Sequence, residues 1–196
     1  MISERTVEQL GTARPGTALP HQPPVRRNGK GCEPVPRDGR RYEVVDGRLL
    51  VTGAQPPAHH TAVVALMIQL KHACPPDLLV SVGSLDFRPT LGISLRPDLL
   101  VCRRADAGRQ LLTAPPVLAV EVLSPSTRIT DVVLKRTLYE THHVPSYWLL
   151  DPTRHELTVL ELTDAGYTCQ AVVQAEETFH ATAPFSINLI PAALTR

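Results

Sequence analysis

The sequence predicts a mixed α/β domain, in which a mixed β-sheet is flanked by helices and preceded by an N-terminal β-hairpin. Three short apolar runs, residues 98–103, 117–123 and 147–150, have the length of buried central strands. A helical pattern separates the second run from the third, so one helix is expected to cross over between two strands of the sheet. Hairpin signals near both ends of the domain add antiparallel pairs.

The composition fits one domain but indicates no particular partner. Of the 196 residues, 43% are hydrophobic, which is enough for a sizeable core. Only 4% are aromatic, so the core is expected to consist mainly of Leu, Val and Ala. The net charge is +1, whereas a strongly basic face would have pointed to nucleic acid.

The cysteine spacing and the hydropathy of the chain indicate the cellular compartment of the protein. None of the four cysteines forms a CxxC pair, so a closed zinc site is not expected. The first 20 residues lack the apolar segment of a secretory signal, and no apolar run approaches the roughly 20 residues of a membrane span. We therefore expect a cytoplasmic protein with reduced cysteines and no membrane contact.

The chain divides into a tail and a domain. Residues 1–36 are rich in Pro, Gly and Arg and contain little that could pack into a core, so they are expected to form a flexible tail. The folded domain is expected over residues 37–196.

The first half of the domain starts with a hairpin over residues 42–50, which turns at Asp46-Gly47. A helix over residues 60–73 follows, with apolar side chains at helical spacing and a proline pair after its end. Residues 78–88 are predicted to form one strand, bent at Gly83.

The second half contains the crossover helix, over residues 129–142, with Thr127 or Thr130 available as its N-cap. After the strand at 147–150, two further strands, 156–162 and 167–173, are predicted to form a hairpin.

The feature that says most about function is Glu121, the one charge in the apolar run 117–123. An ionised carboxylate on a core strand is costly unless it is paired, protonated or bound to metal. Asp98 is the first residue of the preceding apolar run, 98–103. If the two runs form neighbouring strands, Asp98 and Glu121 can meet at one end of the sheet. Two carboxylates are sufficient protein ligands for Mg²⁺, which water and a substrate phosphate complete.

A lysine close to this pair would complete a site that cleaves phosphodiester bonds. Lys135 is one of only three lysines, and it lies four residues after Asp131 on the predicted helix, so the two share a face. Its ammonium could orient or deprotonate an attacking water and offset charge in the transition state.

Each of these residues also has a purely structural interpretation. Asp98 could be a turn residue, Glu121 could pair with Arg128, and Asp131 with Lys135 could be a solvent-exposed helix pair. Histidine pairs at 59–60 and 142–143, and arginine pairs such as 40–41, are most often surface residues. Only the combination on core elements favours catalysis.

The residues in question resemble the Uma2 family, also called DUF820, of restriction-type endonucleases in the PD-(D/E)XK superfamily. The resemblance runs from about residue 40 to the C-terminus. Its segments are 42–47 (YEVVDG), 96–101 (RPDLLV), 120–127 (VEVLSPST), 131–135 (DVVLK) with Tyr139, and 144–152 (VPSYWLLDP).

The resemblance implies a restriction-endonuclease-like core with Asp98 and Glu121 as Mg²⁺ ligands, for which Mn²⁺ would substitute. The usual Glu-x-Lys lysine is absent, because position 123 is Leu, and the family's lysine matches Lys135 instead. The residues implied as accessory members of the site are Glu43, His60 and Asp131. Ser146 stands where the family often has an acid, which puts a role for that position in doubt.

These observations favour a Mg²⁺-dependent endonuclease acting on DNA, expected as a homodimer because a two-fold dimer presents two sites to a duplex. Two alternatives stay open: a non-catalytic module that binds nucleic acid or protein with the same fold, and a metal-dependent hydrolase with another substrate. The sequence has no GxSxG elbow, P-loop or GxGxxG signature, which argues against serine hydrolases, NTPases and Rossmann enzymes.

Overall fold

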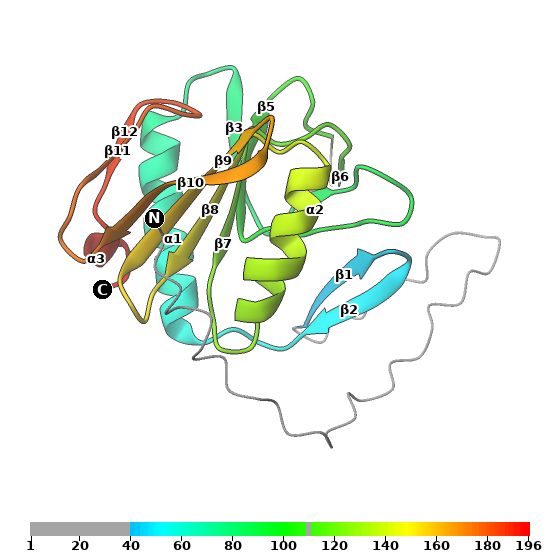
Figure 1. The fold of residues 1–196 in the computed structure, drawn as a ribbon, viewed down its shortest axis with the longest axis horizontal. Helices are drawn as coiled ribbons and strands as arrows, with labels where there is room; N and C mark the ends of the chain where they lie inside the picture. The colour runs from blue at the N-terminus through cyan, green and yellow to red at the C-terminus, as the bar shows by residue number, and fades with distance from the viewer. Residues whose placement is uncertain (1–39, 109–110) are drawn as a thin grey trace.

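The computed structural model describes residues 40–108 and 111–196 (Figure 1). The expected tail over residues 1–36 and the domain boundary at residue 37 lie outside these ranges. Within the described ranges, no helix is long and apolar enough to cross a membrane.

A six-stranded mixed sheet forms the centre of the domain, in the order β10-β9-β8-β7-β5-β3. β7 and β8 are parallel, and every other neighbouring pair is antiparallel. The predicted mixed sheet is therefore confirmed. The strands are β3 (Leu78–Val82), β5 (Leu99–Arg103), β7 (Leu118–Val122), β8 (Ser146–Asp151), β9 (Glu156–Thr163) and β10 (Gly166–Gln174).

Helices cover both faces of this sheet, so alternate residues of each central strand enter different cores (Figure 1). On one face, α1 (Pro57–Ala73) packs Leu66 and its neighbours against Val120 and Val122. On the other face, α2 (Arg136–Thr141) packs Tyr139 against Ala119. β7 is thus buried on both sides, as its apolar sequence predicted.

The α1 helix begins three residues before the predicted start at residue 60. Pro57 occupies its first turn, where a residue without an N–H is tolerated because that N–H would have no partner within the helix. The sequence-based prediction began the helix only at residue 60. The earlier start brings His59 into the first turn.

The N-terminal hairpin agrees with the prediction. β1 (Arg41–Val45) pairs with β2 (Arg48–Thr52). The turn residues Asp46 and Gly47 have φ values of 49° and 73°. Two successive positive φ values are the requirement of the tight hairpin turn that Asp-Gly favours.

The strand predicted over residues 78–88 is two strands. The chain leaves the sheet at Gly83, whose φ of 52° is accessible to glycine at little cost. Beyond this bend, β4 (Asp86–Phe87) pairs in parallel with β6 (Leu111–Leu112) in a separate two-stranded sheet. The bend was predicted, but the change of sheet was not.

The crossover helix starts with α-helical residues 128 and 129, widens into a π-helix, η2 (Thr130–Lys135), and continues as α2. Thr127 directly precedes the first helical residue, but among the described residues neither its hydroxyl nor that of Thr130 accepts a hydrogen bond from a helix N–H. The Thr127 hydroxyl lies 3.0 Å from that of Ser124 instead. The predicted helix is confirmed, but the periodicity of the sequence does not show that η2 is a π-helix.

The C-terminal part completes the layer around α1. β9 and β10 form the predicted hairpin. β11 (Phe179–Ala181) pairs with β12 (Ile187–Leu189), and α3 (Pro191–Leu194) follows; these elements were not predicted, because segments of three or four residues show no measurable period. They supply Leu189 and Leu194 to the core beneath α1.

Candidate active site

Asp98 and Glu121 lie opposite each other at one end of the sheet. β5 and β7 are adjacent and antiparallel, and Leu99 pairs with Val120, so the register places Asp98 beside Glu121. Leu100 and Ala119, two residues away on each strand, share one core. Both carboxylates are buried.

Arg41, from β1, lies between these two acids. Its Nη2 donates a hydrogen bond to Asp98 Oδ1, and its Nη1 lies 3.7 Å from Glu121 Oε2. The sequence-based expectation that the arginine pair 40–41 is solvated is wrong for Arg41. The available signal was its position two residues before Glu43, which puts both side chains on the same face of β1.

Lys135 is surrounded by carboxylates from three different elements. Its Nζ lies 3.0 Å from Glu121 Oε1, 3.1 Å from Glu43 Oε1 and 3.4 Å from Asp131 Oδ1. Only 2% of its side chain is exposed. The pair formed with Asp131 is therefore buried and is not the solvent-exposed pair of the structural interpretation.

The π-helical turn helps to bring these groups together. Over eight residues, an α-helix rotates its face by about 80°, which would separate Asp131 from Tyr139. A π-helix advances by a smaller angle per residue, because its hydrogen bonds join residues five apart. Asp131, Lys135 and Tyr139 consequently all face the sheet and are all buried.

Two tyrosines fix the positions of this helix and of the acids. Tyr139 Oη donates to Glu121 Oε1 at 2.9 Å, so this oxygen is shared with Lys135. Tyr147 Oη donates to the backbone carbonyl of Asp131 at 2.9 Å. Sequence reasoning noted Tyr139 only as part of the family resemblance and did not assign it to the site.

The histidine in contact with the acids is His59, whereas His60 was expected. His59 Nε2 lies 3.1 Å from Asp98 Oδ2, and the same oxygen accepts the backbone N–H of Val122 at 2.8 Å. His60 is exposed and contacts the ring of His59 edge-on. The physical reason for this correction is the early start of α1, which turns residue 59 towards the sheet.

The surroundings of Asp98 and Glu121 shift the pKa values of these two acids in opposite directions. Burial alone would raise the pKa of Asp98, but the hydrogen bond from His59 and the charge of Arg41 outweigh it, so the pKa is lowered well below its usual range. Burial raises the pKa of Glu121 well above its usual range, and Lys135 offsets this effect only in part. Asp98 is thus held as the anion, whereas the charge of Lys135 does not fully offset the cost of burying an ionised Glu121.

Lys135 is held as the ammonium. Burial alone would lower its pKa, but the charges of Glu121, Glu43 and Asp131 more than offset this effect and raise the pKa above its usual value. Burial likewise raises the pKa of Asp131, against the opposing charge of Lys135.

We call the seven residues described above the buried charge cluster: Arg41, Glu43, His59, Asp98, Glu121, Asp131 and Lys135. With four carboxylates against one guanidinium and one ammonium, its formal charge is −2 when all six groups are ionised and His59 is neutral. A divalent cation would neutralise this charge.

The residues present fit a cation held by few protein ligands. In the described part of the chain, no hydrogen-bond donor reaches Glu121 Oε2, although this atom is buried. It faces Arg41 together with Asp98 Oδ1. No group of three or more His, Cys, Asp or Glu side chains within residues 40–108 and 111–196 forms a metal cage. Two hard oxygens suit Mg²⁺, which keeps several waters.

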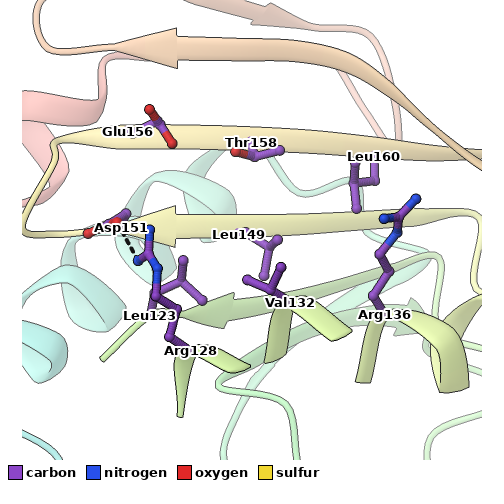
Figure 2. A pocket seen from close by; sticks show the side chains of 9 residues that line it. All are labelled: Leu123, Arg128, Val132, Arg136, Leu149, Asp151, Glu156, Thr158 and Leu160. Carbon is purple, nitrogen blue, oxygen red and sulfur yellow. Dashed lines mark hydrogen bonds and ion pairs between the residues drawn. The ribbon is translucent and has the colours of Figure 1, made fainter. Parts of the chain in front are cut away.

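A separate pocket of about 270 Å³ lies between the crossover helix and strands β8 and β9 (Figure 2). Its lining includes Arg128, whose Nη1 lies 2.6 Å from Asp151 Oδ2. This contact rules out the alternative in which Arg128 pairs with Glu121. None of the lining residues belongs to the buried charge cluster.

Ser146, which departs from the family pattern, lies away from the cluster. It pairs with Leu118 at the start of β8, whereas Glu121 lies opposite Leu149. Its hydroxyl donates to Glu161 Oε1 on β9 at 2.7 Å. The departure therefore leaves the buried charge cluster intact.

Comparisons with known proteins agree with this structure. The profile of the Uma2 family, described as "Putative restriction endonuclease", matches residues 32–194. A solved structure described as "a putative nuclease belonging to DUF820 from Anabaena variabilis ATCC 29413" superposes with a TM-score of 0.69 at 16% sequence identity. That similarity covers 82% of this chain and 93% of the other, and at this identity it shows the fold alone. No curated protein matches the chain. The extent of the profile match shows that the chain belongs to the Uma2 family.

Proposed function

We propose that this protein is a metal-dependent endonuclease that hydrolyses phosphodiester bonds in DNA, with Mg²⁺ as its cofactor and Mn²⁺ able to substitute. The observation that carries the proposal is the meeting of Asp98, Glu121 and Lys135 in one buried cluster with an unsatisfied Glu121 oxygen. Membership of a family described as "Putative restriction endonuclease" supports the same reaction class.

Asp98 and Glu121 would hold the cation through Asp98 Oδ1 and Glu121 Oε2. When bound, a divalent cation lowers the pKa of a coordinated water and offsets charge on the scissile phosphate. The remaining oxygens are already engaged, Asp98 Oδ2 by His59 and Glu121 Oε1 by Lys135 and Tyr139. These contacts fix the rotation of both carboxylates, which precise cation binding requires.

Lys135 supplies a fixed positive charge beside the reacting group. With three carboxylates within 3.4 Å, its ammonium keeps its proton, so its role is to orient the attacking water and to stabilise the charge that develops on the phosphate. Glu43 and Asp131 act as accessory residues, because they hold the ammonium in place from β1 and η2. His59 takes the accessory role expected of His60.

A homodimer is part of this proposal. Cleavage of both strands of a duplex needs two sites, and a two-fold dimer places two copies of one site in equivalent positions. The measurement is light scattering on the purified protein at working concentration. A mass of twice 21.4 kDa is expected, and a stable monomer would contradict this part of the proposal.

The experiment that tests the activity is cleavage of supercoiled plasmid by the metal-stripped protein after addition of Mg²⁺, Mn²⁺ or Ca²⁺. We expect cleavage with the first two and not with Ca²⁺, whose looser coordination does not organise an in-line attack. Asp98→Asn and Glu121→Gln should abolish cleavage, and Asp164→Asn, at an exposed turn, should not. Cleavage retained in Glu121→Gln would contradict the proposal.

A further inference from the structure

The two oxygens of Asp98 have different environments. Oδ2 accepts hydrogen bonds from His59 Nε2 and from the backbone N–H of Val122, at 3.1 and 2.8 Å. Both donors are parts of the packed domain, one at the start of α1 and one on β7. Oδ1 accepts only the guanidinium of Arg41 among the described contacts. One half of this carboxylate is thus fixed by the fold, and the other half is held by a single long side chain.

Glu121 shows the same division. Its Oε1 accepts hydrogen bonds from Lys135 and Tyr139 at 3.0 and 2.9 Å. Its Oε2 has no hydrogen-bond donor in the described part of the chain, and Arg41 Nη1 lies 3.7 Å from it. The two oxygens that the fold leaves available, one on each acid, therefore both face one guanidinium.

We propose that Arg41 is a built-in counter-ion that occupies the cation position of the metal-free protein, and that a divalent metal binds by displacing it. This inference rests on the metal site of the proposed function and goes beyond it, because it makes metal affinity a competition within the chain. The guanidinium and the metal need the same two oxygens, so both cannot occupy the position at once.

Exposure is consistent with a side chain that can leave. The Arg41 side chain is 19% exposed, whereas those of the other six members of the buried charge cluster are 0–3% exposed. Lys135 is enclosed by three acids and cannot leave without breaking all three contacts. Arg41 has a solvent-facing part and makes one hydrogen bond within the cluster, so its displacement disrupts little of the packed core.

The charges of the cluster also favour replacement of the Arg41 guanidinium by a divalent cation. A guanidinium carries one positive charge and stays protonated at any pH at which the protein is folded. The cluster then keeps a formal charge of −2, and Glu121 Oε2 stays without a hydrogen bond. A divalent cation brings twice the charge and can bind both oxygens directly. Arg41 thus prevents repulsion between the two acids when metal is absent, at the expense of weaker metal binding.

The test is a calorimetric titration of the metal-stripped protein with Mn²⁺ alone, in the wild type, Arg41→Ala and Arg41→Gln. Gln retains a polar side chain without charge, which guards against unfolding of the Ala variant. Arg48→Ala is the matched control, because this arginine lies on β2 of the same hairpin and is exposed. Asp98→Asn reports whether binding occurs at the cluster.

We expect both Arg41 variants to bind Mn²⁺ about tenfold more tightly or better, the size of effect that loss of one competing charge-assisted hydrogen bond produces. Arg48→Ala should match the wild type. Mn²⁺ should also raise the melting temperature more in the Arg41 variants than in the wild type.

Unchanged or weaker Mn²⁺ binding in both Arg41 variants, with binding lost in Asp98→Asn, would overturn the role of Arg41 and leave the proposed function standing. Absence of Mn²⁺ binding in every variant would overturn both, because then the cluster would not be a metal site.

Discussion

Tyr139 donates a hydrogen bond to the same Glu121 oxygen that Lys135 contacts, with distances of 2.9 and 3.0 Å. A neutral hydroxyl and an ammonium thus act together on one buried oxygen. This arrangement explains why the other oxygen of Glu121 points towards the Arg41 position and not towards the helix.

We predict that Tyr139→Phe lowers both stability and activity. Loss of a buried hydrogen bond to a carboxylate costs about 1–3 kcal/mol in free energy of unfolding, and the freed carboxylate is less well oriented for a cation. Urea denaturation and plasmid cleavage are the two measurements. The control is Tyr167→Phe, which loses a 2.7 Å hydrogen bond to the Val144 carbonyl away from the cluster. It should lower stability only; an equal loss of activity in both variants would contradict the assignment.

Lys135→Met should destabilise the metal-free protein by about 3–5 kcal/mol, because it leaves buried carboxylates without their cation. Lys71→Met, on the exposed side of α1, should change stability little. Turnover should be lost in Lys135→Met, and Lys135→Arg should not restore it fully, since the larger planar guanidinium does not fit a position enclosed by three acids. Denaturation and single-turnover cleavage measure these effects, and wild-type stability in Lys135→Met would refute them.

The two adjacent histidines provide an internal comparison. His59→Ala removes a contact that orients Asp98, and loss of such a partner typically lowers metal affinity or activity about 10–100-fold. His60→Ala should behave as the wild type, because its side chain is exposed. Mn²⁺ affinity measured in parallel for the two variants decides the matter, and a larger effect from His60→Ala would restore the original sequence-based choice.

The π-helical segment can be tested by deletion of Val133, a residue that is 60% exposed. Removal of one residue should convert the π-turn into α-helix and leave Asp131 three residues before Lys135 instead of four, which displaces its carboxylate relative to the Lys135 ammonium. We expect about a hundredfold or greater loss of cleavage, since small displacements of catalytic groups have effects of this size. Circular dichroism should show that the domain remains folded. Val133→Ala is the control and should keep full activity; full activity in the deletion would show that the π-turn is dispensable.

The central part of this fold could be predicted from sequence because it is strongly patterned. The apolar runs that became β5, β7 and β8 are buried on both faces, and an acid within such a run stands out. Asp98 and Glu121 were identified as candidates for this reason, and Lys135 because it is one of three lysines and lies on the helix that follows.

The surrounding contacts could not be predicted in the same way. Arg41 looked like a surface residue, because its spacing from Glu43 shows only that the two share a face and not that the hairpin folds back onto the end of the sheet. His59 and His60 could not be distinguished until the start of α1 was known. The π-turn leaves no periodic signal over so few residues. In each case, long-range packing determines which side chain meets the acids.

The most direct test of the account is the anomalous difference density of a crystal soaked in Mn²⁺ and measured near the manganese absorption edge. We predict one strong peak between Asp98 Oδ1 and Glu121 Oε2, with the Arg41 side chain moved out of that position. Density elsewhere, or no peak between these two carboxylates at saturating Mn²⁺, would contradict the claim that they form the metal site.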